Sequence, residues 1–298
     1  MPRSDTQTEN LTGILLMLGS MALFAVEDLF LKLAAANLPV GQIVLISGAL
    51  GAPVFFVMAW RQGRGIFVAE ALHPAVIARN LGEMVAAAAY LAALAVVPLG
   101  TVAAVLQALP LAVTMGAALL FGERVGWRRW TAIALGFAGV LLVIRPGGEG
   151  FRAETLLVLV SVAGIVVRDL SARAIPARVT TAQVSAWGLL AVAVLGLGMI
   201  ASTGEVRGVT GAEALVLAGA VVFGTAGYWA VTAATRTGEV AVVAPFRYSR
   251  LVFAMGLGMV FLAERPNAPT LAGAGLIVAS GLYAFARERR RKRASHAD

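Results

Sequence analysis

The chain contains no cysteine among its 298 residues. Disulfide bonds, thiolate catalysis and cysteine-ligated metal centres are therefore excluded. Charge is also scarce, because only 13% of the residues are Asp, Glu, Lys or Arg, whereas 59% are hydrophobic. A soluble domain needs more polar residues to cover its surface, so this composition indicates a membrane protein.

Residues for catalysis are almost as scarce. His73 and His296 are the only histidines, and the chain has no His-Glu-x-x-His, Gly-x-Ser-x-Gly or Walker A sequence. Neither aspartate within the apolar runs lies in a Gly-x-Gly-Asp motif. The chain therefore lacks the catalytic motifs that an intramembrane enzyme would need. We therefore expect no enzymatic activity, no metal and no cofactor. Because the chain has no Walker A sequence, any transport of a substrate would be driven by an ion gradient or be passive.

The long apolar runs predict an all-α membrane protein. About 20 apolar residues in a helix cross a hydrocarbon core of about 30 Å, whereas barrel strands alternate in polarity. The connections are short and leave no room for an extramembrane domain. Runs bounded by glycine, proline or charge predict ten transmembrane helices, at 11–34, 41–60, 74–97, 101–121, 130–144, 155–170, 182–201, 214–234, 240–262 and 270–286.

The net charge of +8 is spread over short loops and a basic tail at 288–298. Most of the 24 Lys and Arg residues fall on one side if the N-terminus is cytoplasmic, as the positive-inside rule requires. We therefore expect both termini in the cytoplasm and membrane lipid as a partner. Nucleic-acid binding is the less favoured explanation of the charge, and we expect no nucleic-acid partner. The first span is expected to be retained and not cleaved as a signal peptide.

The chain repeats itself in its second half. Val-Glu-Asp-Leu-Phe-Leu-Lys at 26–32 returns as Val-Arg-Asp-Leu-Ser-Ala-Arg at 167–173. At the same offset Gln42 matches Gln183, and Glu123 matches Glu264. Five spans per unit is an odd number, so the second unit must be inverted relative to the first. The predicted units are a first repeat at 11–146, a second at 152–287 and the cytoplasmic tail at 288–298.

Two span ends carry a family resemblance. Phe-Gly-Glu-Arg at 121–124 and Leu-Ala-Glu-Arg at 262–265 each precede a glycine-bearing last span. These features resemble the drug/metabolite transporter superfamily, EamA type. The resemblance implies two five-helix units that form a ten-helix carrier, exporting small metabolites across the bacterial inner membrane. Ala263 departs from the family's Gly-Glu motif, and Leu18-Gly19 stands where the family has Trp-Gly.

Within that family the chain most resembles the YddG-like group of amino-acid exporters. The resemblance implies a small-molecule substrate such as an amino acid, moved by alternating access through a central cavity, and we expect the chain to act as a monomer. Efflux of organic cations or drugs is the alternative, and would need acidic and aromatic cavity residues without an essential arginine. A membrane scaffold or receptor would give no reason for inverted symmetry or for charges at the midplane.

Charged residues near the bilayer centre are candidates for substrate binding, because each costs about 2.5 to 3.5 kcal/mol to insert. The helical rise places Glu83 and Arg250 near the midplane, with Arg247 one turn shallower. We hypothesise that Glu83 and Arg250 face one cavity and bind the ammonium and carboxylate of a zwitterion. An intrahelical pair between Arg79 and Glu83 is the structural alternative. Pro245 is expected to kink or break this ninth span.

Aromatic and amide side chains complete the candidate cavity. Tyr90 shares a helix face with Glu83, and its repeat mate Tyr228 is followed by Trp229. These rings are expected to line an apolar pocket or contact a cation, with lipid or packing contact as the alternative. Gln107 lies on a polar stripe of the fourth span that serves either ligand contact or helix packing.

The two repeated clusters are candidates for gates or structural charges, namely Glu27, Asp28, Lys32, Arg168, Asp169 and Arg173. Asp28 with Lys32, and Asp169 with Arg173, have the i,i+4 spacing of pairs on one helix face. The helical rise places the first pair near the outer interface and the second near the inner one. The residue before each aspartate points about 100° away from it and is free to face a pathway or another helix.

Overall fold

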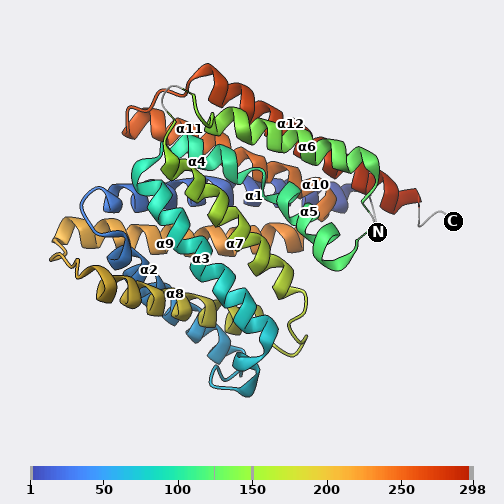
Figure 1. Ribbon diagram of the computed structural model, residues 1–298. Coiled ribbons are helices and arrows are strands. Elements are labelled where there is room, and N and C mark those ends of the chain that lie inside the picture. The colour runs from blue at the N-terminus through green and yellow to red at the C-terminus, as the bar shows by residue number, and fades with distance from the viewer. Residues whose placement is uncertain (1–2, 124, 149–150, 295–298) are drawn as a thin grey trace.

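The computed structural model describes residues 3–123, 125–148 and 151–294, and in these ranges every regular element is helical (Figure 1). Nine segments in the described part are long and apolar enough to cross a membrane, and a tenth, residues 240–261, is divided among three short helices. The first half contains α1 (Arg3–Ala35), α2 (Val40–Arg61), η1 (Ala69–Leu72), α3 (Pro74–Val96), α4 (Leu99–Leu106), α5 (Leu109–Phe121) and α6 (Trp127–Ile144). The second half contains η2 (Ala153–Thr155), α7 (Leu156–Ala172), α8 (Thr181–Thr203), α9 (Gly211–Thr237), α10 (Val240–Val243), η3 (Ala244–Tyr248), α11 (Ser249–Phe261) and α12 (Ala268–Ala294).

Each of the ten predicted spans coincides with one helix, or with consecutive short helices, of the structure, and we call each of these ten segments a crossing. The predicted all-α, ten-span fold is therefore confirmed. Helices are the form that such apolar runs take, because lipid offers no partners for backbone N–H and C=O groups. The protein is a multi-pass membrane protein.

Two crossings are broken in the middle, one in each half. The span predicted at 101–121 is divided into α4 and α5, because the regular helix is interrupted by a turn at Gln107 and Ala108, which keep right-handed helical dihedrals. Pro110 lies in the first turn of α5, where its missing N–H is tolerated. In the second half η3 interrupts the crossing between α10 and α11 and contains Pro245, as predicted.

Figure 1 shows α2 and α8 at one edge of the bundle, and α4, α6, α11 and α12 at the opposite edge. Between these edges α1 packs on α9, and α3 packs on α7 while crossing the view diagonally. The extensive pairs α1 with α9, α2 with α8, α3 with α7 and α6 with α12 each join a helix of the first half to one of the second.

Both chain ends lie on the same side of the molecule (Figure 1). We call this side the terminal face, and the other side the opposite face. The predicted assignment of the terminal face to the cytoplasm rests on the distribution of basic residues.

Glycines bring the paired helices into backbone contact. A Cβ on Gly82 of α3 would lie 2.7 Å from the carbonyl oxygen of Gly164 on α7, and a Cβ on Gly164 would meet Gly82 in return. On α8, a Cβ on Gly196 would collide with the backbone nitrogen of Leu45 on α2. Small residues at such crossings let the helices approach more closely than side chains would allow.

The two faces are packed differently. Near the opposite face the residues at the α3–α4 turn and the end of α6 are buried in one apolar cluster, which includes Leu94, Val97, Leu99, Val102 and Ile144. The interior toward the terminal face is instead hollow, with open space between the two halves.

Candidate functional site

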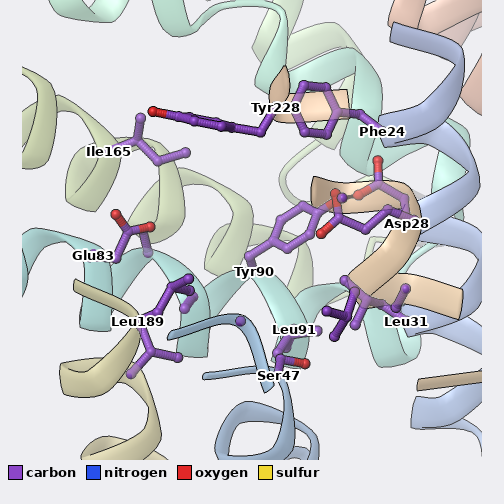
Figure 2. Close-up of a pocket in the computed structure, with 18 of the residues that line it drawn as sticks. Phe24, Asp28, Leu31, Ser47, Glu83, Tyr90, Leu91, Ile165, Leu189 and Tyr228 are labelled. Atoms are coloured by element: carbon purple, nitrogen blue, oxygen red, sulfur yellow. Dashed lines mark hydrogen bonds between the residues drawn. The ribbon is translucent and has the colours of Figure 1, made fainter. Parts of the chain in front are cut away.

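A central cavity of about 360 Å³ lies between the two halves. This volume is at the lower end of the range of small-molecule sites, about 300 to 1,000 Å³. Its walls come from both halves and are mainly apolar and aromatic, as Figure 2 shows for Phe24, Ile165, Leu189 and Tyr228. Mostly apolar walls with a few polar groups are typical of small-molecule sites.

A vestibule of about 790 Å³ continues from the cavity. It extends along the broken crossings and reaches residues 175–177 and 179, in the loop between α7 and α8 at the terminal face. The cavity is therefore accessible from the terminal face, and the buried apolar cluster closes it toward the opposite face. Residues common to both spaces include Glu27, Glu83, Arg168, Tyr228 and Arg250.

Asp28 forms the most buried ion pair of the cavity. Its side chain is 2% exposed, and Nη2 of Arg250 lies 2.7 Å from Oδ2. Arg250 also donates to Asp28 through Nε, at 3.2 Å, and the hydroxyl of Tyr90 donates to Oδ1 at 2.5 Å. The expected pair between Asp28 and Lys32 near the outer interface is therefore wrong. Partners from α3 and α11 reach this face of α1, whereas Lys32 is held elsewhere.

Lys32 seals the opposite face instead. Its Nζ donates to the carbonyl oxygens of Leu94 and Val97, at 2.8 and 2.6 Å, and lies 3.9 Å from Oε1 of Glu264. Glu264 in turn accepts hydrogen bonds from the backbone N–H groups of Leu99 at 2.7 Å and Gly100 at 3.3 Å. These contacts tie the ends of α1 and α3 to the first turn of α4, which a carboxylate stabilises as an N-terminal cap.

Glu83 is the centre of a second network, on α3 and α7. Arg79 places Nη2 2.8 Å from Oε2 of Glu83, so the intrahelical pair that the spacing allowed is present. Arg168 lies 3.3 Å from the other oxygen and also donates to Asp169 through Nε at 2.8 Å. Asp169 therefore does not pair with Arg173, as its spacing had suggested.

Arg173 binds Glu123 at the terminal face, with 2.6 Å between Nη1 and Oε1. The i,i+4 rule identified neither partner of these two residues. Asp169 pairs with the residue directly before it on α7, and Arg173 pairs with a residue that follows α5, so neither contact has the i,i+4 spacing.

Glu83 and Arg250 line the same cavity, as hypothesised. Figure 2 shows Glu83 and Asp28 at opposite sides of it, with Tyr90 adjacent to Asp28. Neither hypothesised residue is free, however. Glu83 is shared by Arg79 and Arg168, and the guanidinium of Arg250 is already bound by Asp28.

Glu27 is the uncommitted carboxylate of the cavity. It lines both the cavity and the vestibule, and it has no hydrogen bond or ion pair with the described residues. Its carboxylate packs so closely on Gly224 of α9 that a Cβ at that position would collide with it. The sequence indicated this orientation through the 100° offset from Asp28, but did not indicate that the group lacks an ion pair.

The aromatic candidates separate into two groups. Tyr228 lines the cavity and meets Phe55 edge-on, with 5.1 Å between ring centroids. Trp229 lines neither space, and its side chain is 65% exposed on the outer surface, so its expected cavity position is wrong. Adjacent residues on a helix point about 100° apart, so only one of the two can face the cavity.

Gln107 and Arg247 line the vestibule at the two helix breaks, and not the central cavity. Phe24 is a cavity residue that sequence reasoning missed, and the guanidinium carbon of Arg250 lies 5.3 Å from its ring centroid. Its i,i+4 spacing to Asp28 was the available signal.

The fold and the site define a class of protein. A bundle of ten crossings in two five-helix halves, with a cavity open to one face and sealed at the other, is that of a membrane transporter. The chain belongs to the EamA-like transporter family, which matches residues 11–145 and 153–285.

Three curated relatives are named as transporters. A riboflavin transporter of Rhizobium johnstonii is 29% identical over 72% of this chain and 72% of its own length. A pseudopaline exporter of Pseudomonas aeruginosa is 26% identical over 90% of this chain and 93% of its own. An S-adenosylmethionine uptake transporter of Rickettsia felis is 22% identical over 68% of each chain.

Among solved structures, a crystal structure that was compared with this chain shares the fold. It aligns with a TM-score of 0.60 at 21% identity, over 93% of this chain and 98% of that chain.

Proposed function

We propose that this transporter exports small metabolites that carry an ammonium group, with amino acids as the leading class. The observation that carries the proposal is Glu27, a carboxylate in a central cavity that forms no ion pair with the described residues. The names of the relatives are all those of transporters, which supports transport and not catalysis.

An ammonium group fits Glu27 on electrostatic grounds. A carboxylate taken out of water is costly unless it is paired, and a cationic substrate would provide the pair. The rings of Phe24, Phe55 and Tyr228 lie in the same cavity wall. Aromatic faces attract cations and also accept apolar side chains, so the wall suits the remainder of an amphipathic amino acid.

The carboxylate of an amino acid has a donor available on Arg250. Asp28 receives hydrogen bonds from Nε and Nη2 of that guanidinium. A guanidinium carries five N–H donors, and Nη1 has no hydrogen bond to another residue in the described part of the chain. A substrate carboxylate bound at Nη1 would leave the pair with Asp28 intact.

Organic cations are the second candidate, favoured by one specific observation. Arg250 is bound by Asp28, so a cation that needs only Glu27 and the aromatic wall would meet no unsatisfied positive charge at that position. The two candidates differ in whether the substrate carboxylate contributes to recognition.

Counterflow in proteoliposomes tests the proposal, with a panel of labelled amino acids, their carboxamides and organic cations. We expect amino acids to be transported, and their amides to be at least about tenfold poorer, because a site that binds a carboxylate strongly rejects analogues without it. Glu27→Gln should abolish transport of the whole panel, while Glu70→Gln, a surface control at the terminal face, should not.

Two outcomes would redirect the proposal. Equal transport of amino acids and amides, or transport of cations alone, would assign the protein to organic-cation efflux. Full activity of Glu27→Gln would remove the ammonium site. The accessibility of the cavity from the terminal face, predicted to be cytoplasmic, supports loading from inside and release outside.

A further inference from the structure

The seal at the opposite face is built around one acidic residue, Glu264, which follows α11. Its carboxylate caps α4 through the N–H groups of Leu99 and Gly100 and lies beside Lys32. A Cβ on Gly258 would come within 2.5 Å of its Oε2, so this glycine leaves the space that the carboxylate occupies. A single carboxylate thus connects the ends of three helices at the closed face.

The repeat places the same parts at the terminal face. Glu123 follows α5 as Glu264 follows α11, and Arg173 follows α7 in the position that corresponds to Lys32. The start of α10 at Val240 lies 141 residues after the start of α4 at Leu99, which is also the offset between Glu123 and Glu264. The carboxylate, the basic residue and the helix start of the seal therefore each have a counterpart at the terminal face, whereas Ala117 stands in the position of Gly258.

These counterparts are not assembled at the terminal face. Glu123 and Arg173 bind each other, both side chains are 52% exposed, and Glu123 contacts no helix N-terminus among the described residues. The N–H of Glu239, just before α10, donates instead to the side-chain oxygen of Asn10 at 2.8 Å. At the open face the carboxylate therefore pairs with its basic residue and caps no described helix, whereas at the closed face it caps α4.

We propose that Glu123 and Arg173 form a second gate. When the terminal face closes, the carboxylate of Glu123 caps the first turn of α10 at the N–H groups of Val240 and Ala241. Arg173 then donates to carbonyl groups at the end of α9, as Lys32 does at the end of α3. The two gates assemble alternately, and each carboxylate is a helix cap only in the state in which its own face is closed.

The physical basis is a difference in binding between two states. The first N–H groups of a helix have no intrahelical partner, and a carboxylate that accepts them makes charge-assisted bonds favoured by the helix dipole. An interaction made in one state only shifts the equilibrium toward that state. Because both gates use one carboxylate and one basic residue, the two states are kept close in free energy.

The absence of native cysteine makes this proposal directly testable. Thr225 lines the central cavity, and its hydroxyl bonds only to the carbonyl of Val221 on its own helix, so Thr225→Cys provides a single reporter thiol. A membrane-impermeant maleimide is added to one side of vesicles of known orientation, without substrate. The ratio of labelling rates from the two faces reports the populations of the two states.

Three carboxylate variants are compared in this background. Glu264→Gln weakens the seal seen here and should raise labelling from the opposite face relative to the terminal face by roughly tenfold, the effect of losing one charge-assisted bond. Glu123→Gln should change the ratio by a similar factor in the other sense. Glu70→Gln is the matched control, because Glu70 forms a surface ion pair with Arg178, 2.8 Å long, and should leave the ratio unchanged.

The proposal is overturned if Glu123→Gln behaves as Glu70→Gln does, since Glu123 would then be an ordinary surface ion pair. It is also overturned if Glu123→Gln and Glu264→Gln shift the ratio in the same sense. The proposal rests on the transport function but not on the substrate class. Because no substrate is added, failure here leaves the ammonium site at Glu27 untouched, and failure of the transport panel leaves the gate untouched.

Discussion

Asp28 and Arg250 form a two-edged ion pair between α1 and α11, with Nη2 of the guanidinium 2.9 Å from Oδ1 and 2.7 Å from Oδ2. The pair connects the first helix of one half to the broken crossing of the other. In the alternating-access mechanism that the family resemblance implies, these are the two units that would move relative to each other.

Removal of either partner should destabilise the protein strongly. Arg250→Ala leaves the carboxylate of Asp28 buried without a charge partner, which costs about 3 kcal/mol. Arg250→Gln should be similarly damaging, whereas the double variant Asp28→Asn with Arg250→Gln should recover much of the loss. Thermal unfolding of the detergent-solubilised protein measures all three. A loss in the double variant equal to the sum of the two single losses would show that the pair has no net coupling.

Ala263 is predicted to be a site of backbone strain. It adopts a positive φ of 52°, in the left-handed region, where Gly122 stands in the first half with a φ of 66°. Glycine accepts this conformation without steric cost, so Ala263→Gly should raise stability by about 1 kcal/mol. The reverse change, Gly122→Ala, should lower stability by a similar amount. Paired melting curves test both, and an unchanged or lower melting temperature for Ala263→Gly would contradict the prediction.

Adding one methyl group at the contact between α2 and α8 should destabilise the protein. Gly196→Ala would drive a Cβ into the backbone of Leu45 and separate the helices, with an expected cost of about 2 kcal/mol. Gly198 lies on the same helix, and a Cβ added there would meet no atom within 4 Å, so Gly198→Ala is the matched control. That control should be neutral or stabilising by about 0.5 to 1 kcal/mol, because alanine favours helix more than glycine does. Melting curves of the two variants measure the difference, and equal stabilities would contradict the prediction.

Gly224 should control the position of the Glu27 carboxylate. A methyl group at Gly224 would occupy the space of Oε1, so Gly224→Ala should displace Glu27 and raise the substrate KM about tenfold or more. Gly275→Ala on α12, where nothing lies within 4 Å, should leave the KM unchanged. Initial rates in proteoliposomes measure the effect. A normal KM for Gly224→Ala would mean that Glu27 does not contact the substrate.

The fold could be predicted from the sequence because its determinants are local. Apolar runs of membrane-spanning length, with glycine and proline at their ends, located every crossing, and Pro245 indicated the break in the ninth. The break at Gln107 and Ala108 was missed, since the proline that accompanies it lies inside the following helix and leaves the apolar run uninterrupted.

The site was only partly predictable, because its partners lie on different helices. Asp28 has Lys32 at the right spacing on its own helix, but its actual partner comes from α11. The depth of Asp28 in the membrane, estimated by counting from residue 11, was also wrong, because α1 has 33 residues, more than one bilayer crossing needs. Tyr228 and Trp229 are similar in sequence terms, and only the packing of α9 on α1 decides which of them faces inward.

The pairing of helices across the two halves has a consequence for biosynthesis. α1, α2, α3 and α6 each have their most extensive contact with a helix that is synthesised later. The first five crossings must therefore remain in the bilayer with unsatisfied packing surfaces until the ribosome has delivered the rest. A chain divided between residues 146 and 152 should accumulate only when both fragments are made in the same cell.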